Sequence, residues 1–226
     1  MFFNGEDVMY RYGVYFLFCF SVLACVSCRH VERTYYPDGT LEAEAGYFRG
    51  KLDGRATWYY EHGKKRMELD YASGKKHGTM TRFFRNGAIE TQQNYCNDTL
   101  DGISQEYGDN GLLVNEVIYE KGRKNGKYRQ YYADGTLSIE GNFAKDMYDG
   151  VWKYYDADGF LAGEALFSNG NGIVTTFDED GFIKRKTPYK NNLIDGTEEH
   201  YDKNGTIEKT ITYSEGRLIE VKNINH

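Results

Sequence analysis

The chain has 226 residues and carries 28 lysines and arginines against 34 aspartates and glutamates, a formal net charge of −6 at pH 7. This mild acidity gives no basic surface for a nucleic-acid backbone, so a DNA- or RNA-binding role is not expected. The composition includes 26 glycines, 21 tyrosines and 13 phenylalanines but only 2 prolines. Because tyrosine and phenylalanine favour strands and glycine favours turns, these numbers exclude a helical bundle and predict many short strands.

An apolar segment occupies residues 14–26, interrupted only by Ser21. As a helix it would span roughly 20 Å, less than the ~30 Å hydrocarbon core of a bilayer. The segment therefore predicts a signal peptide rather than a membrane span. We assign residues 1–28 to a lipoprotein-type signal segment with a short tether and residues 29–226 to the mature protein.

The apolar segment ends in cysteine. The sequence VLAC at residues 22–25 resembles the bacterial lipobox, in which a small residue precedes the cysteine that is diacylated and becomes the mature N-terminus. Cys25 is thus the predicted lipidation site, with Cys28 as the alternative. Acyl chains contribute about 0.8 kcal/mol per buried CH₂, so we expect a membrane-anchored protein of the bacterial cell envelope, facing the periplasm or the surface. An ordinary secretory signal with incidental cysteines is the other interpretation.

Glycines recur with a period of 24 residues along the rest of the chain, each preceded by Asp, Asn or His. These dipeptides suit left-handed turn conformations, so we expect a chain reversal at each glycine and two strands in each repeat. One interval in each series is 22 residues, and we expect a shortened loop between Phe167 and Gly172. The first series is Gly39, Gly63, Gly87, Gly111, Gly135, Gly159, Gly181 and Gly205, and the second is Gly54, Gly78, Gly102, Gly126, Gly150, Gly172 and Gly196.

Two aromatic positions accompany the first series. The residue eight positions after each glycine is Tyr47, Tyr71, Tyr95, Tyr119, Phe143, Phe167, Tyr189 or Tyr213. Even positions after the glycine tend to be apolar and odd positions polar, which predicts a strand with one buried face. A second aromatic residue stands four positions before each glycine, as at Tyr59. A three-residue loop would pair it with the position two after the glycine, so we predict three-residue hairpins that stack all these aromatic side chains on one face.

The predicted fold is therefore all-β, an elongated antiparallel sheet of about seven to eight tandem 24-residue hairpins in residues 29–226. A lone hairpin is only marginally stable, so neighbouring repeats must share the aromatic core. At ~4.8 Å per strand, roughly fifteen strands give a ribbon about 70 Å long.

Residues 119–128, with the sequence YEKGRKNGKY, form a clear example of the repeating unit. The unit resembles the MORN-repeat-variant family over residues 35 to about 219. Bacterial members with this organisation are often labelled YwqK-type antitoxins. The resemblance implies consecutive β-hairpins in an extended sheet and a role in binding, and it carries no catalytic residues. Phe143 and Phe167 depart from the family's usual tyrosine.

No pattern in the sequence indicates an enzyme, a cofactor or a metal site. Three of the five histidines, His62, His77 and His226, stand in predicted turns or at the chain end, and the carboxylates fall in turns or on the polar face. A phosphate-binding loop, a nucleophile elbow and a Cys-x-x-Cys pair are all missing.

Three binding functions follow. The first is a lipid-anchored envelope protein whose long sheet binds a protein partner. The second, from the family label, is an antitoxin that sequesters a partner toxin, although the export segment counts against a cytoplasmic target. The third is binding of cell-wall glycan, because residues 151–159 are similar to cell-wall-binding repeats. In that case Trp152 and Tyr154 would be exposed ligand contacts.

Overall fold

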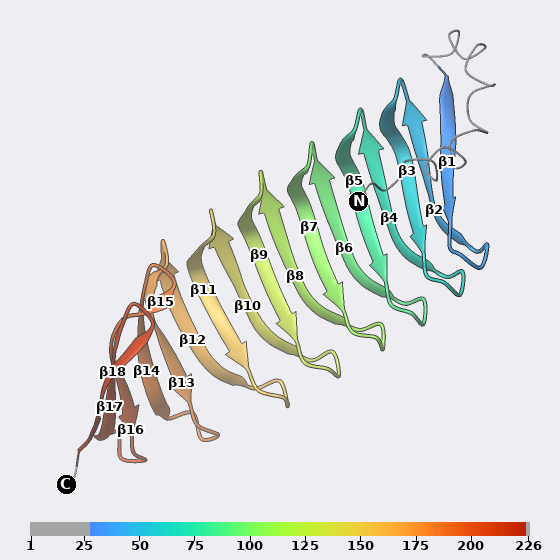
Figure 1. The fold of residues 1–226 in the computed structure, drawn as a ribbon. Helices are drawn as coiled ribbons and strands as arrows, with labels where there is room; N and C mark the ends of the chain where they lie inside the picture. Colours follow the sequence, from blue (N-terminus) through green and yellow to red (C-terminus); the bar gives the residue numbers. More distant parts are fainter. Residues whose placement is uncertain (1–27, 225–226) are drawn as a thin grey trace, which may run out of the picture.

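The computed structural model describes residues 28–224, which form one antiparallel sheet of eighteen strands without a helix (Figure 1). Each strand pairs with the next one in the chain, and β15 and β16 are two parts of one strand, both paired with β14. The predicted all-β fold of tandem hairpins is confirmed. The strands are β1 Arg29–Tyr35, β2 Leu41–Phe48, β3 Lys51–Tyr59, β4 Lys65–Ala72, β5 Lys75–Phe83, β6 Ile89–Cys96, β7 Thr99–Tyr107, β8 Leu113–Glu120, β9 Arg123–Tyr131, β10 Leu137–Ala144, β11 Met147–Tyr155, β12 Leu161–Ser168, β13 Asn171–Phe177, β14 Ile183–Lys190, β15 Leu193–Ile194, β16 Gly196–Tyr201, β17 Ile207–Ser214 and β18 Arg217–Asn223.

The first connection of each repeat is the predicted three-residue loop. Between β3 and β4, the amide of Gly63 donates to the carbonyl oxygen of Tyr60 at 2.7 Å. Gly63 has a φ of 81°, in the left-handed region that glycine adopts without a Cβ clash. Tyr59 pairs with Lys65 and Trp58 with Met67, so a one-residue bulge adjoins the loop. All eight glycines of the first series have positive φ and donate the same hydrogen bond.

The second connection is shorter than the sequence predicts. Ser73 and Gly74, with φ of 52° and 85°, form a two-residue turn in which both residues are left-handed. The second-series Gly78 lies beyond this turn, inside β5, at a φ of 101°. There the register shifts between the Tyr71–Lys76 and Leu69–Met80 pairs, which makes His77 and Gly78 a bulge.

The prediction of a chain reversal at the second series was therefore wrong, because a bulge requires a left-handed residue just as a turn does. All seven of these glycines lie within strands or, at Gly196, at the start of one. The residues concerned are Gly54, Gly78, Gly102, Gly126, Gly150, Gly172 and Gly196.

The 22-residue unit lacks the bulge. Strands β12 and β13 pair without a register change as far as Ser168 and Asn171. The two-residue turn is retained, so the missing residues shorten the strand and not the loop: β13 has 7 residues where β11 has 9. Figure 1 shows strands β13–β18 from a different side than the preceding strands, so the sheet changes direction at this unit.

One face of the sheet, which we call the aromatic face, carries the core. Its centre is a cluster of buried residues, in which Phe143 is 6% exposed and Phe167 2% exposed. These are two of the residues eight positions after the first-series glycines. Partly buried tyrosines from the neighbouring repeats, among them Tyr119 and Tyr189, pack against the cluster. The single layer thus buries its own core by contacts between successive hairpins.

The aromatic residues four positions before each glycine lie on the opposite face, which corrects the prediction of a single aromatic face. Tyr154 packs against the core, and its neighbour Tyr155 donates from its hydroxyl to Oε1 of Glu140 at 2.8 Å on the other side of the sheet. In the same way Tyr59 donates to Glu44 at 3.0 Å. The bulge beside each three-residue loop is the cause, because its extra residue reverses the alternation of side chains.

Candidate functional site

A row of directly paired residues crosses the middle of this second face, with one residue from each strand. We call the row the ladder and this side of the sheet the ladder face. At ~4.8 Å per strand the ladder is about 80 Å long. Its members are Arg33, Glu44, Thr57, Glu68, Thr81, Gln92, Gln105, Glu116, Arg129, Glu140, Lys153, Glu164, Thr175, Lys186, Glu199, Thr210 and Lys222.

Hydrogen bonds link ladder residues to one another and to the tyrosines beside them. Gln105 donates from Nε2 to Glu116 at 2.8 Å and accepts from the hydroxyl of Tyr107 at 3.0 Å. At the C-terminal end, the hydroxyl of Tyr201 donates to Oε2 of Glu199 at 2.5 Å. This bond to a carboxylate is the main reason that the pKa of Tyr201 is raised to about 12. Tyr201 therefore stays neutral at neutral pH and orients the carboxylate of Glu199.

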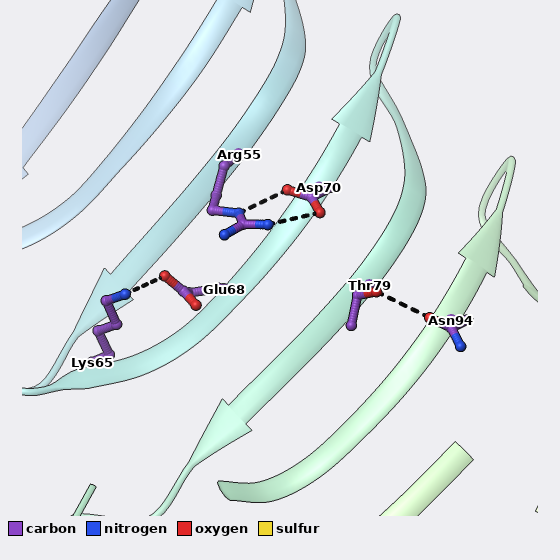
Figure 2. Close-up of polar contacts among 6 residues, drawn as sticks. All are labelled: Arg55, Lys65, Glu68, Asp70, Thr79 and Asn94. Carbon is purple, nitrogen blue, oxygen red and sulfur yellow. Dashed lines mark hydrogen bonds and ion pairs between the residues drawn. The ribbon is translucent and has the colours of Figure 1, made fainter. Parts of the chain in front are cut away.

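A second set of cross-strand contacts lies beside the ladder. Figure 2 shows Arg55 of β3 facing Asp70 of β4, with Nε and Nη2 at 2.9 and 3.1 Å from the two carboxylate oxygens. The Asp70 carboxylate raises the pKa of Arg55 through this hydrogen bond. In the next repeat the pair is uncharged, and Thr79 Oγ1 donates to Asn94 Oδ1 at 3.0 Å (Figure 2). The same positions thus change from charged to neutral along the sheet.

Further along, this second row becomes apolar and exposed. Val151 of β11 pairs with Leu166 of β12, and Leu166 pairs with Ile173 of β13. Their exposed fractions are 56%, 71% and 53%. Apolar side chains in a continuous row on three adjacent strands form a surface of the kind that marks interaction sites. We call Val151, Leu166 and Ile173 the apolar row.

Seven segments of the chain match the model of the family described as MORN repeat variant: residues 31–48, 52–73, 76–97, 124–145, 148–169, 171–191 and 194–215. The chain belongs to the MORN repeat variant family. Each matched segment covers most of one hairpin, from β1–β2 to β15–β17. No curated protein matches the chain.

The MORN repeats include one hairpin that the family model leaves unmatched. Strands β7 and β8 lie between the third and fourth matched segments. Their loop has the common geometry, with Gly111 donating to the carbonyl oxygen of Gly108 at 2.9 Å and Tyr107 paired with Leu113. MORN repeats are commonly protein-binding or scaffold modules, and the family is generally non-catalytic.

The MORN sheet uses Trp152 as a core residue. Trp152 is 3% exposed, lies in an aromatic cluster with Phe143 and Tyr148, and donates from Nε1 to the carbonyl oxygen of Asn142 at 3.1 Å. Burial raises the pKa of its neighbour Tyr154. The prediction that these two residues are exposed was wrong for Trp152, because its indole packs over the small residues Gly141 and Ala165 of the neighbouring strands.

The predicted lipidation site falls largely outside the described part of the chain. Cys25 is not among residues 28–224, and Cys28 is an exposed residue immediately before β1. Among the described residues, no helix has the length and apolar character to cross a membrane.

One buried polar contact on the aromatic face was not found from the sequence. Thr187 Oγ1 donates to Glu198 Oε2 at 2.7 Å, and Nε2 of His200 lies 2.7 Å from Glu198 Oε1. The carboxylate thus lies between the hydroxyl and the imidazole, which is not the order of hydroxyl, imidazole and carboxylate found in a catalytic triad. Residues 28–224 also contain no group of three His, Cys, Asp or Glu side chains arranged to hold a metal ion.

Contacts that join successive MORN repeats at the loops were also not predicted from the sequence. The hydroxyl of Tyr36 donates to the carbonyl oxygen of Tyr59, and that of Tyr60 to the carbonyl oxygen of Phe83, at 2.7 and 2.8 Å. Both donors stand three positions before a first-series glycine. The 24-residue period, which brings equivalent positions of adjacent hairpins together, was the signal that could have identified them.

Proposed function

We propose that this MORN-repeat protein is a non-enzymatic scaffold that binds a partner protein through its ladder face. The observation that carries the proposal is the exposure of the apolar row in a sheet whose ladder face is covered by no other segment of residues 28–224. Leu166 alone is 71% exposed. A protein interface combines such an apolar centre with polar groups around it, and the ladder provides those donors and acceptors.

Crosslinking in cells followed by mass spectrometry tests the scaffold function. The full chain should be compared with a Leu166→Asp/Ile173→Asp variant, which makes the apolar row acidic. Leu193→Asp/Leu218→Asp is the matched control, since these leucines are 49% and 60% exposed but lie in β15 and β18, outside the row. We expect a discrete partner to be recovered with the wild type and the control and at least tenfold less with the double variant. Equal recovery with all three proteins would contradict the proposal.

The same proposal assigns the scaffold to the bacterial cell envelope, anchored by acyl chains on Cys25, or alternatively on Cys28. Its support is the lipobox-like sequence at residues 22–25 after an apolar segment. Two acyl chains suffice for stable membrane attachment. Metabolic labelling with palmitate should be lost in Cys25→Ser and kept in Cys28→Ser. An unlabelled wild-type protein recovered from the cytosol would rule out the anchor but not the binding role.

Antitoxin activity would be one form of this scaffold function, with a toxin as the partner. The family label supports it, and the export segment opposes it for a cytoplasmic toxin. Co-expression of the chain with a growth-inhibiting product of a neighbouring gene tests it directly. Restored growth would establish the activity, and unchanged inhibition would dismiss it.

A further inference from the structure

The ladder face contains a hollow of about 480 Å³ between β9, β10 and β11. Its lining on this face consists of Lys127, Arg129, Glu140, Asn142, Val151 and Lys153. Three cations thus surround one carboxylate, although the whole chain has a formal net charge of −6. The lining of the hollow on this face therefore has a formal net charge of +2, and the ladder residues that flank it, Glu116 and Glu164, are acidic.

The protein itself leaves much of this positive charge unpaired. Glu140 is already engaged by the hydroxyl of Tyr155 at 2.8 Å. Arg129 Nη1 is 3.7 Å from the carboxylate of Glu116, which is beyond hydrogen-bond length. Within residues 28–224, neither Lys127 nor Lys153 forms an ion pair with a carboxylate. An incoming carboxylate would therefore find donors that no internal group occupies.

The hollow is continuous with the apolar row. Val151 lines the hollow and pairs with Leu166, which in turn pairs with Ile173. From Lys127 in β9 to Ile173 in β13 there are four strand spacings, about 19 Å at ~4.8 Å each. An extended segment of about six residues covers this distance. One short peptide could thus reach the cations and the apolar side chains at the same time.

We propose that the hollow and the apolar row bind an acidic segment of the partner protein, in which aspartate or glutamate residues adjoin apolar ones. The inference rests on the proposed scaffold function and names the chemistry of its partner. Carboxylates would bond to Lys127, Arg129 and Lys153, and apolar side chains would cover Leu166 and Ile173. A nucleic acid or a sulfated glycan satisfies the cations but leaves the apolar row in water, so a protein segment fits better.

Selection from a random peptide library displayed on phage tests this inference with the full chain as bait. The test variant is Lys127→Glu/Arg129→Glu/Lys153→Glu, and the control is Lys51→Glu/Lys75→Glu/Lys203→Glu, which changes the net charge equally at exposed sites outside the hollow. We expect the wild type to enrich peptides rich in acidic and apolar residues. A labelled synthetic copy should bind the control as it binds the wild type and bind the test variant at least tenfold more weakly.

Two further variants test whether the loss of binding is due to misfolding and measure how much the apolar row contributes to peptide affinity. Lys127→Gln/Arg129→Gln/Lys153→Gln should keep the β-type circular dichroism of the wild type and still lose most of the peptide affinity. Leu166→Ser should weaken binding about threefold or more without changing its salt dependence, because it removes an apolar contact only.

The inference would be overturned if the enriched peptides lacked acidic residues. It would also be overturned if the labelled peptide bound the test variant and the control equally. Binding of heparin or polyphosphate with no enrichment of acidic peptides would also overturn it, in favour of a polyanion site. If cellular crosslinking recovers a partner equally well with the wild type and with the test variant, the inference fails and the scaffold function stands. If no discrete partner is recovered, both fail.

Discussion

Gly141 lies directly against the indole of Trp152, and a Cβ at position 141 would overlap the ring. The other neighbour of Trp152 in the sheet is Ala165, so two small residues make room for the largest side chain of the core. Substitution Gly141→Ala forces the indole out of its position. We expect a loss of about 1–3 kcal/mol in the free energy of unfolding, measured by urea denaturation.

Two controls separate this overlap from a general effect of replacing glycine. Gly108→Ala should cost no more than about 1 kcal/mol, because the added Cβ would displace only Oδ1 of Asn110, whose hydrogen bond from the amide of Leu112 lies at an exposed loop. In a Trp152→Ala background, Gly141→Ala should cost almost nothing further. An equal loss in both backgrounds would show that the indole is not the cause.

Asn192 connects two turns that the regular repeat would keep apart. Its Oδ1 accepts from the amide of Tyr148 at 2.8 Å and its Nδ2 donates to the carbonyl oxygen of Asp146 at 2.7 Å, across the short unit. The equivalent Asp98 makes a single such bond, to the amide of Lys76 at 2.9 Å. Asn192→Ala should therefore destabilise the protein by about 1 kcal/mol more than Asp98→Ala.

The comparison is balanced because Asn192 and Asp98 have almost the same backbone conformation, with φ of 67° and 68°. The cost of placing alanine in the left-handed region is then common to both variants. Equal stabilities of the two variants in urea would mean that the contact across the short unit adds nothing to the fold.

The Arg55–Asp70 pair on the ladder face should contribute little to stability. The two side chains are 58% and 30% exposed, and such pairs are worth about 0.2–1 kcal/mol. A double-mutant cycle should give a coupling energy in this range that falls in 1 M salt. The Thr79–Asn94 pair at the same positions of the next repeat is the uncharged control, and its coupling should not respond to salt. A large, salt-insensitive coupling for Arg55 and Asp70 would contradict this assignment.

Alkaline pH should destabilise the sheet through its tyrosines. Burial raises the pKa of Tyr189, and hydrogen bonding to Glu199 raises that of Tyr201 to about 12. Unfolded tyrosine ionises near pH 10, so above this pH the unfolded chain releases protons that the folded chain retains. The stabilising contribution is complete below about pH 10 and is lost as the pH rises towards 12. Urea unfolding at several pH values, with tyrosinate absorbance, measures this. Ionisation near pH 10 with undiminished stability would contradict it.

Most of the fold could be predicted from the periodicity of the sequence, because each first-series glycine closes a three-residue loop in a left-handed conformation in every repeat. The pairing of Tyr59 with Lys65 follows from loop length alone. The prediction for the second series was wrong for a related reason. A glycine preceded by Asp, Asn or His indicates a left-handed backbone, and at His77 and Gly78 that conformation forms a bulge inside a strand. The sequence pattern does not distinguish the two uses.

The candidate site could be predicted only in part. The alternation of glutamates with apolar residues indicated a polar face, and Glu140 lies on it as expected. The bulge that moves Tyr155 to that face, and the direct pairing that aligns one ladder residue per strand, depend on a register that appears only when neighbouring hairpins are placed together. Trp152 was misread as exposed because its burial depends on small residues in other strands, Gly141 and Ala165.

Site-specific photo-crosslinking in cells tests most directly whether the ladder face binds the partner. A benzophenone amino acid placed at Leu166 lies in the apolar row, and the same amino acid placed at the exposed Glu106 lies on the aromatic face. In the full chain we expect a discrete adduct of higher mass from position 166 and none from position 106. An adduct from position 106 alone, or no adduct from position 166, would contradict binding through the ladder face.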